Sequence, residues 1–525
     1  MYQSDVWKCS SSVQVCTGIE SAKLKIIPNF AHLCRRAKDM SQVIKNLKIR
    51  TSPGLGYRLL RAYADPAFLA SYSSVQFVGL ENIPENCAVI VAPNHTNGLM
   101  DPLAAMSLGR FQLSDGRKGK IAPMIFAARA DMFRIPGLRE LLLSLYVTPV
   151  MRIRDGFSHL GENAAIMDEV SDRLCDGIPY CIMAEGTQRD KRSLLPLLKG
   201  IFRVALQTDD KLSGKVPVVI LPVGIGYGSF YRYRSTLLVN VGKPLDVSEF
   251  RRSHPELTQP ELMNLLRSEL TGRMKSLFLC IDDDPDYEAV LEICHIVSEY
   301  RLLSSSADGG FSLYDRMLSD KEAVDSLYAL RDSADAAEHE KYSSLVRLGV
   351  EAAELRKKLH VSASSYSGLH RPLFAGQFMR RKDMAGKDVR CGLKRVPESL
   401  RAFELALTFP YWIFSVAVTS PILLIVEILC KVQEDMAFLV SLRYAVAAFT
   451  LPLLWVVYAA LLAVFMPKGL WWVSVLLLLL FIPAYTFAHD WFKALRLLVS
   501  DRRFSRSRRL SSLAVEVRSA FSNRS

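Results

Sequence analysis

His95 and Asp101 stand with five residues between them in the stretch VAPNHTNGLMDPL, residues 91–103. A histidine ring can take a proton from an alcohol when a carboxylate holds its other ring nitrogen and stabilises the imidazolium that forms. The asparagines and the glycine of this stretch allow the backbone to turn back and bring Asp101 to His95. The pair is therefore a candidate general base with its orienting carboxylate.

The rest of the chain supplies no obvious protein nucleophile. No serine or cysteine lies in a GxSxG or papain-type setting. The base would then act directly on a substrate hydroxyl, which points to group transfer without a covalent enzyme intermediate. No residues show metal-ligand spacing, so we expect no metal. The segment GIGYG, residues 224–228, looks like a dinucleotide-binding loop, but a second predicted strand follows it where such a loop needs a helix N-terminus.

Short apolar runs alternate with amphipathic stretches between about residues 85 and 250. The apolar runs predict strands at residues 87–93, 147–153, 179–186, 216–224 and 236–244. The amphipathic stretches predict helices at residues 123–147, 158–176 and 194–207, and helical spacing continues through residues 53–77. That last segment would lie on a membrane surface or pack on the sheet. Strands separated by helices predict an α/β sheet with functional residues at strand ends, and His95 follows the first predicted strand.

Three apolar stretches near the C-terminal end predict membrane insertion. They cover residues 405–430, 444–465 and 470–487, each about the 20 residues that cross a hydrocarbon core. Basic residues on both flanks favour an even number of crossings. The first stretch contains Pro410 and Pro421, so a re-entrant or interfacial course is its alternative.

The formal net charge of +13 admits nucleic acid, an anionic membrane or an anionic substrate as a partner. The basic residues that flank the apolar stretches favour lipid headgroups, and no RNA-binding aromatic signature or zinc-finger spacing is present. We therefore expect no nucleic-acid partner. The ten cysteines include no CxxC pair and the first residues lack a signal-peptide core, which favours reduced thiols over disulfides in a lumenal domain.

Four segments, in order, resemble the glycerolipid acyltransferase family. They are NHTNGLMD at residues 94–101, TPVMR at 148–152, AEGTQRDKRSLLPLLKG at 184–200 and VVILPVGIGY at 218–227. The five-residue spacing, the LLPLLKG ending, the segment DPDYEAVLEI at 284–293 and the apolar C-terminal stretches are most similar to the fungal-type glycerol-3-phosphate and dihydroxyacetone-phosphate acyltransferases. The likeness extends over roughly residues 80–490 and implies a mixed sheet flanked by helices.

The resemblance also implies roles for single residues. His95 would be the base and Asp101 its orienting partner. The implied substrate-binding residues are Arg152, Glu185, Gly186, Thr187 and Lys199, of which Arg152 and Lys199 would bind the acceptor phosphate.

Some positions depart from the common family pattern. Four residues usually separate the histidine and the aspartate, where this chain has five. Met183 and Ala184 replace the usual Phe and Pro, and Gln188 stands where Arg is common. Whether Arg189 replaces that arginine is open. Two further arginines in YRYRS, residues 231–235, would contact phosphate or lie on lipid headgroups.

The family likeness implies transfer of a fatty acyl group from acyl-CoA to the sn-1 hydroxyl of glycerol 3-phosphate or dihydroxyacetone phosphate, without a cofactor. Acylation of lysophosphatidic acid, a non-catalytic membrane scaffold and a basic nucleic-acid binder are the alternatives. We expect an integral membrane protein of the endoplasmic reticulum with its catalytic domain facing the cytosol. The expected parts are an N-terminal extension at 1–52, the acyltransferase domain at 53–250, a charged helical region at 251–360, a basic linker at 361–401, a transmembrane region at 402–490 and a basic tail at 491–525.

Overall fold

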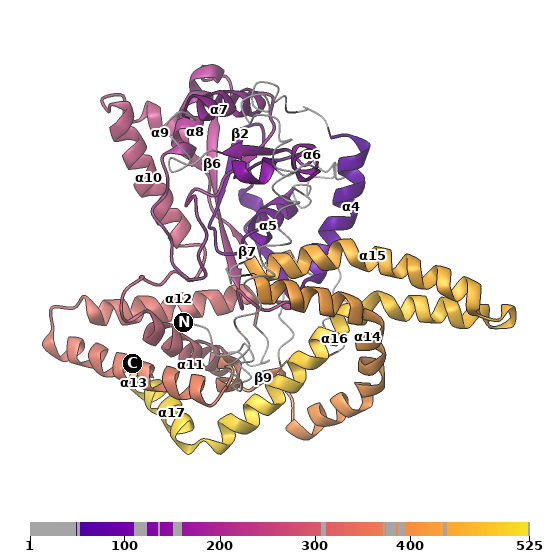
Figure 1. Cartoon of the computed structure of the whole chain (residues 1–525). Coiled ribbons are helices and arrows are strands. Elements are labelled where there is room, and N and C mark those ends of the chain that lie inside the picture. Colours follow the sequence, from indigo (N-terminus) through magenta and orange to yellow (C-terminus); the bar gives the residue numbers. More distant parts are fainter. Residues whose placement is uncertain are drawn as a thin grey trace, which may run out of the picture.

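The computed structural model combines a sheet unit, a helical unit and a group of long apolar helices (Figure 1). It describes residues 49, 53–109, 123–134, 137–150, 160–305, 311–370, 373, 385–386, 394–433 and 438–522. The strands and the helices α7 to α10 form the sheet unit, and α11, α12, α13 and α17 lie together below it. The apolar helices α15 and α16 extend to one side as a pair.

An eight-stranded mixed sheet forms the core of the first unit. Its strands are β1 (Tyr72–Val78), β2 (Ala88–Pro93), β3 (Ile125–Arg129), β4 (Val147–Val150), β5 (Tyr180–Cys181), β6 (Val218–Tyr227), β7 (Ser235–Val241) and β8 (Leu245–Asp246). The order is β1-β7-β6-β2-β5-β3-β4, with β8 added beside β6. Strand β6 runs antiparallel to β7 and β8, and the other described pairs are parallel. The predicted mixed sheet is confirmed.

Alternating side chains of the central strands enter two separate cores, because successive residues of a strand point to opposite faces. Along β2, Ile90 packs in one core and Val89 and Val91 in the other. The first core is covered by α7 (Leu160–Cys175), α8 (Gly200–Leu212) and α10 (Gln259–Lys275). The second is covered by α4 (Leu55–Ala70), α5 (Met100–Leu108) and the first turns of α15 (Leu439–Phe465). An apolar helix of the C-terminal region is therefore part of the second core of the sheet unit.

Three predicted helices differ from the observed elements. The segment 53–77 is helical only as α4, and its second part is the edge strand β1. The segment 123–147 begins with β3, and its helix α6 covers only Leu138–Ser144. The third helix begins at Gly200 rather than at residue 194. In the first two cases strand pairing overrides a local pattern that is equally compatible with a helix.

The helical unit contains α11 (Tyr287–Ser305), α12 (Leu313–Arg331), α13 (Ala336–Lys358) and α17 (Arg508–Ser522) around one apolar cluster. A buried ion pair lies inside it. The guanidinium of Arg356 on α13 donates to both carboxylate oxygens of Glu292 on α11, at 2.7 and 2.8 Å. Tyr366 adds a hydroxyl donor at 2.6 Å. Such a pair stabilises the fold only while the carboxyl is ionised.

We expect acid to destabilise this unit through Glu292. Burial alone would raise the pKa of its carboxyl, but hydrogen bonding and charge from His295 and Arg356 outweigh burial and lower the pKa to about 2. The carboxylate therefore stabilises the fold above its ordinary pKa, and this stability is lost as the pH falls toward 2, by about 3 kcal/mol in total. Thermal unfolding of the full-length protein from about pH 6 to about pH 3 measures the loss. Glu292→Gln should flatten that profile, and the exposed control Glu354→Gln should not.

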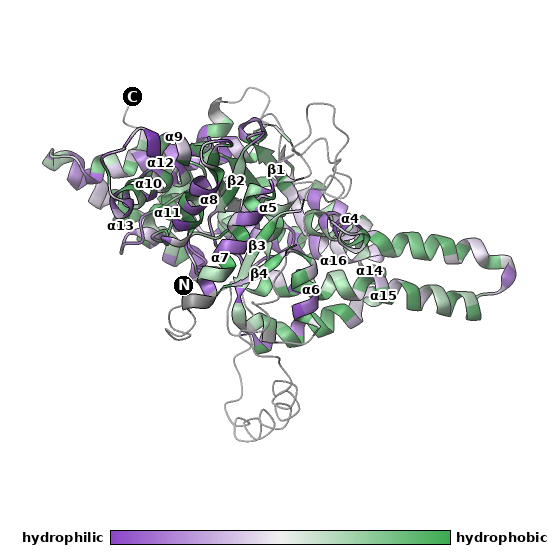
Figure 2. Ribbon diagram, turned by 90° about the horizontal axis from the view of Figure 1, so that it is seen from above, coloured by the Kyte–Doolittle hydropathy of each residue, from purple (hydrophilic) through white to green (hydrophobic). Residues whose placement is uncertain are grey.

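Among the described residues, three helices are long and apolar enough to cross a membrane: α14 (Glu398–Val432), α15, and α16 (Trp471–Arg506) with the turn before it. Figure 2 shows their apolar residues along the extended pair of α15 and α16. None of the most apolar window of α15 is buried inside the protein, and large side chains such as Val464 and Phe465 are more than 70% exposed. Surface of this kind requires an apolar environment such as lipid.

Candidate active site

The loop 94–99 carries His95 from the end of β2 to the start of α5. Asn94 anchors the loop, because its side-chain amide donates to the carbonyl of Ile225 on β6 at 3.1 Å and accepts its N–H at 2.6 Å. After Asn94 the loop reverses direction and leads into the first turn of α5. Asp101, in the first turn of α5, thereby reaches His95, and its Oδ2 lies 2.9 Å from the His95 Nδ1.

Asp101 is fully buried, and four donors surround its carboxylate. Oδ2 accepts the backbone N–H groups of Thr96 and Asn97, both at 2.7 Å, besides the His95 ring. Oδ1 accepts the hydroxyl of Tyr227 at 2.6 Å. A carboxylate with this donor set accepts a hydrogen bond from Nδ1–H, which leaves Nε2 of the neutral His95 ring as the acceptor. The geometry suits a histidine base.

Tyr227 is a site residue that the sequence analysis did not single out. It ends β6, inside the fourth family-like segment, and its hydroxyl reaches Asp101 across 126 positions of chain. Burial and the Asp101 charge raise the pKa of Tyr227 well above its ordinary value, so the phenol stays protonated and donates. Its place at the C-terminal end of a strand beside β2 was the available signal.

Glu185 lies behind the histidine rather than on an open surface. It is 4% exposed, and its two carboxylate oxygens accept the backbone N–H groups of His95 at 2.6 Å and of Leu195 at 2.8 Å. Burial raises the pKa of this carboxyl. These contacts tie the AEG segment to the histidine loop, which favours a positioning role over direct contact with substrate.

The other predicted substrate-binding residues lie in different surroundings. Gly186 has φ +66°, and a Cβ there would meet Leu198 Cδ1 at 2.2 Å, so the turn needs a glycine. Thr187 is exposed, and Lys199 is exposed directly before α8. Arg152 lies outside the described residues.

Two of the arginines left open by the sequence have protein partners. Arg189 forms an ion pair with Asp283 at 2.5 Å and donates to Ser193 Oγ at 2.5 Å. Arg234 is buried against Asp490 of α16, with Nη2 2.6 Å from Oδ2. Arg234 is thus a structural cation and not one that lies on lipid headgroups.

The first turn of α15 supports the histidine loop. The Leu99 N–H donates to Ser441 Oγ at 3.0 Å. Gly98 has φ +36°, and a Cβ there would lie 2.9 Å from Phe438 Cδ2 and from Ser441 Oγ. Because the glycine permits this close approach, the apolar region and the loop form one packed structure.

We expect Gly98→Ala to disturb the loop more than an ordinary glycine replacement does. Its Cβ would push α15 away from the loop in addition to the strain of a positive φ, at a cost of about 1–3 kcal/mol. Gly177→Ala is the matched control, since Gly177 has φ +80° and nothing within 4 Å of its Cβ position. Both variants should lower the unfolding temperature. Only Gly98→Ala should also lower the turnover number, kcat, of the reaction that depends on His95, because only this variant displaces the histidine loop. Equal kcat values in the two variants would contradict the supporting role of α15.

Comparison with known proteins adds three findings. Residues 74–226 match the family model described as Acyltransferase. Glycerol-3-phosphate O-acyltransferase 1 of Saccharomyces cerevisiae is 26% identical over 135 residues, which are 25% of this chain and 17% of that protein. The crystal structure of the 1-acyl-sn-glycerophosphate (LPA) acyltransferase PlsC from Thermotoga maritima aligns with a TM-score of 0.29 and 20% identity, over 49% of this chain and 92% of that chain.

The yeast alignment spans less than a fifth of that relative, so it bears on a segment only. The match to the family model covers more of the sheet unit. It begins in β1, ends in β6 and includes the histidine loop, Asp101 and Glu185. The sheet unit of this chain therefore contains a domain that matches the Acyltransferase family model.

Proposed function

We propose that the protein transfers a fatty acyl group from acyl-CoA to the sn-1 hydroxyl of glycerol 3-phosphate or dihydroxyacetone phosphate. The observation that carries the proposal is the His95–Asp101 pair, with Nδ1 held by a buried carboxylate and Nε2 left to accept a proton. The name of the yeast relative favours glycerol 3-phosphate as the acceptor.

In this reaction His95 Nε2 takes the proton of the acceptor hydroxyl while its oxygen attacks the thioester carbonyl. The tetrahedral oxyanion then collapses, the carbon–sulfur bond breaks, and the CoA sulfur leaves with the proton from the imidazolium. Asp101 stabilises the imidazolium between these two steps. The cation Lys199 is the candidate for the acceptor phosphate among the described residues, and Arg152 is a second candidate from the sequence.

The apolar helices suit the lipid product. A site held against α15 would deliver the 1-acyl glycerol phosphate, or its keto analogue, directly to the membrane. We place the protein in the endoplasmic reticulum with the catalytic domain in the cytosol, where acyl-CoA and the small acceptors are soluble. No step of this reaction requires a cofactor.

An acceptor assay tests the function. Membranes that contain the protein receive labelled acyl-CoA with glycerol 3-phosphate, dihydroxyacetone phosphate or lysophosphatidic acid, and membranes with His95→Ala supply the background. Product from either small acceptor, absent in the variant, is the expected result. Product from lysophosphatidic acid alone would replace the proposed acceptor, and no product from any acceptor would favour a non-catalytic scaffold.

A further inference from the structure

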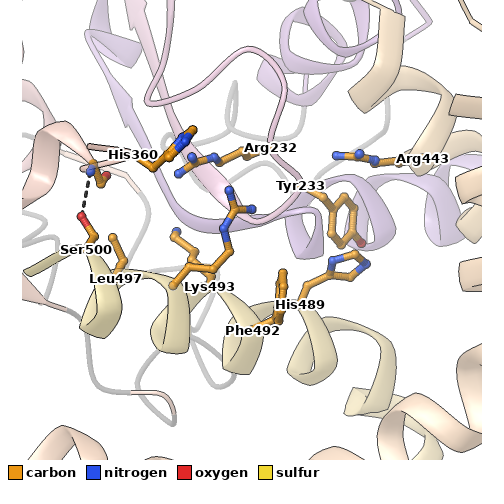
Figure 3. A pocket seen from close by; sticks show the side chains of 11 residues that line it. Arg232, Tyr233, His360, Arg443, His489, Phe492, Lys493, Leu497 and Ser500 are labelled. Atoms are coloured by element: carbon orange, nitrogen blue, oxygen red, sulfur yellow. Dashed lines mark hydrogen bonds between the residues drawn. The ribbon is translucent and has the colours of Figure 1, made fainter. Parts of the chain in front are cut away.

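A basic cleft of about 120 Å³ lies between the sheet unit and the apolar helices (Figure 3). Its walls come from the loop between β6 and β7, from α15, from α16 and from the segment after α13. The lining cations are Arg232, Arg443, Lys493 and Arg496, with His360 and His489 beside them. Arg232 is one of the two arginines whose role the sequence left open, and none of the other predicted site residues that the structure describes lines this cleft.

The charge of the described lining is one-sided, because it includes no aspartate or glutamate. Two of the cations are held by neutral backbone groups. Arg443 Nη1 donates to the carbonyl of Tyr231 at 2.9 Å, and Lys493 Nζ donates to the carbonyl of Arg234 at 2.8 Å. These hydrogen bonds orient the cations without cancelling their charge. The cleft is therefore an electropositive site.

The geometry of the walls suits a small anion with several acceptor oxygens. In Figure 3, Arg232 and Lys493 lie on opposite sides of the same space. Guanidinium groups bind phosphate oxygens in pairs, and an ammonium adds a point charge. A cavity of this size has room for several water-sized groups, enough for a phosphate and its ester carbon but not for a whole lipid.

The position of the cleft along α16 brings it to the edge of the apolar region. Lys493 and Arg496 come within one to three turns after the last apolar stretch, which ends at residue 487. Cations at the end of a membrane helix lie at the level of lipid headgroups. Phe492 also lines the cleft and is 42% exposed, so apolar surface adjoins the charge.

We propose that this cleft is a second ligand site that binds a phosphate monoester, carried by a lipid headgroup or by a soluble molecule. The dianion matches the several lining cations better than a singly charged phosphodiester does. The proposal concerns binding and does not depend on which acceptor the catalytic site uses.

Binding to the full-length protein in a non-ionic detergent tests the proposal. The lipid probe is dioctanoyl phosphatidate, the soluble probe is inorganic phosphate, and dioctanoyl phosphatidylglycerol is the phosphodiester comparison. Equilibrium dialysis measures each Kd in the wild type, in Arg232→Gln/Arg496→Gln and in the control Arg503→Gln/Arg506→Gln. The control removes the same charge from exposed residues of α16 that do not line the cleft.

The expected result is a loss of at least about tenfold in affinity for a phosphate monoester in the cleft variant and little change in the control. Loss for phosphatidate alone assigns a lipid headgroup, and loss for inorganic phosphate as well assigns the phosphate group itself. The proposal is overturned if both phosphatidate and inorganic phosphate bind the cleft variant as they bind the wild type, or if the wild type binds the phosphodiester as tightly as phosphatidate. The second comparison needs no variant and therefore does not depend on correct folding of one.

Discussion

Asp101→Asn is expected to lower kcat for the proposed acyl transfer by about 10³–10⁴-fold and to leave the KM for the proposed donor, acyl-CoA, little changed. An asparagine carbonyl at the Oδ2 position can still accept the N–H groups of Thr96 and Asn97, which lie at 2.7 Å. The amide carries no charge, however, and no longer stabilises the His95 imidazolium. Steady-state kinetics of the variant and the wild type in the same membranes measure the effect.

Two further variants serve as comparisons for Asp101→Asn. Tyr227→Phe removes the hydroxyl that donates to Asp101 Oδ1 but keeps the carboxylate, so a smaller loss of about tenfold is expected. Asp176→Asn changes an exposed aspartate at the end of α7 and should leave kcat unchanged. If Asp101→Asn retained more than about a tenth of the wild-type kcat, His95 would not act as a base assisted by Asp101.

The contact between His95 and Asp101 was predictable because all of its determinants are local. A predicted strand, a turn-forming segment and the start of a helix lie within about a dozen residues, so six positions of chain bring His95 and Asp101 together. Three central strands were predictable for a similar reason, since β2, β6 and β7 are runs of apolar residues, whereas the mixed direction of the sheet was implied only by the family likeness. The short strand β3 was not, because its five residues show no alternation that distinguishes a strand from a helix.

The contacts between the sheet unit and the apolar helices could not be predicted from the sequence. Ser441 meets Leu99 across 342 positions, and Arg234 meets Asp490 across 256. Neither pair has a spacing that marks it. An arginine in YRYRS and an aspartate after an apolar stretch look like a surface cation and a helix-end charge. Arg234 and Asp490 form a buried ion pair only because the apolar helices pack on the sheet unit.

Loss of the Arg234 side chain should destabilise the protein by about 3–5 kcal/mol, because it leaves the Asp490 carboxylate buried without a counter-charge. Arg234 is 3% exposed, and its Nε and Nη2 donate to Asp490 between 2.6 and 3.0 Å. Its Nη1 also donates to the carbonyls of Ala70 and Tyr72, both at 2.7 Å. One side chain thus joins α4, β1 and α16. Arg234→Gln should lower the thermal midpoint in detergent by several degrees.

The double variant Arg234→Met/Asp490→Leu tests the cause of that loss. If an uncompensated charge is responsible, replacing both partners by apolar side chains should recover most of the stability lost in Arg234→Gln, since buried ion pairs are often matched by apolar residues of similar size. Arg252→Gln, which breaks a mostly exposed pair with Glu249, should have little effect. A double variant as unstable as Arg234→Gln would instead assign the stability to the hydrogen bonds with Ala70 and Tyr72. In that case the arginine would act as a tether of the backbone between α4 and β1, and its ion pair with α16 would be secondary.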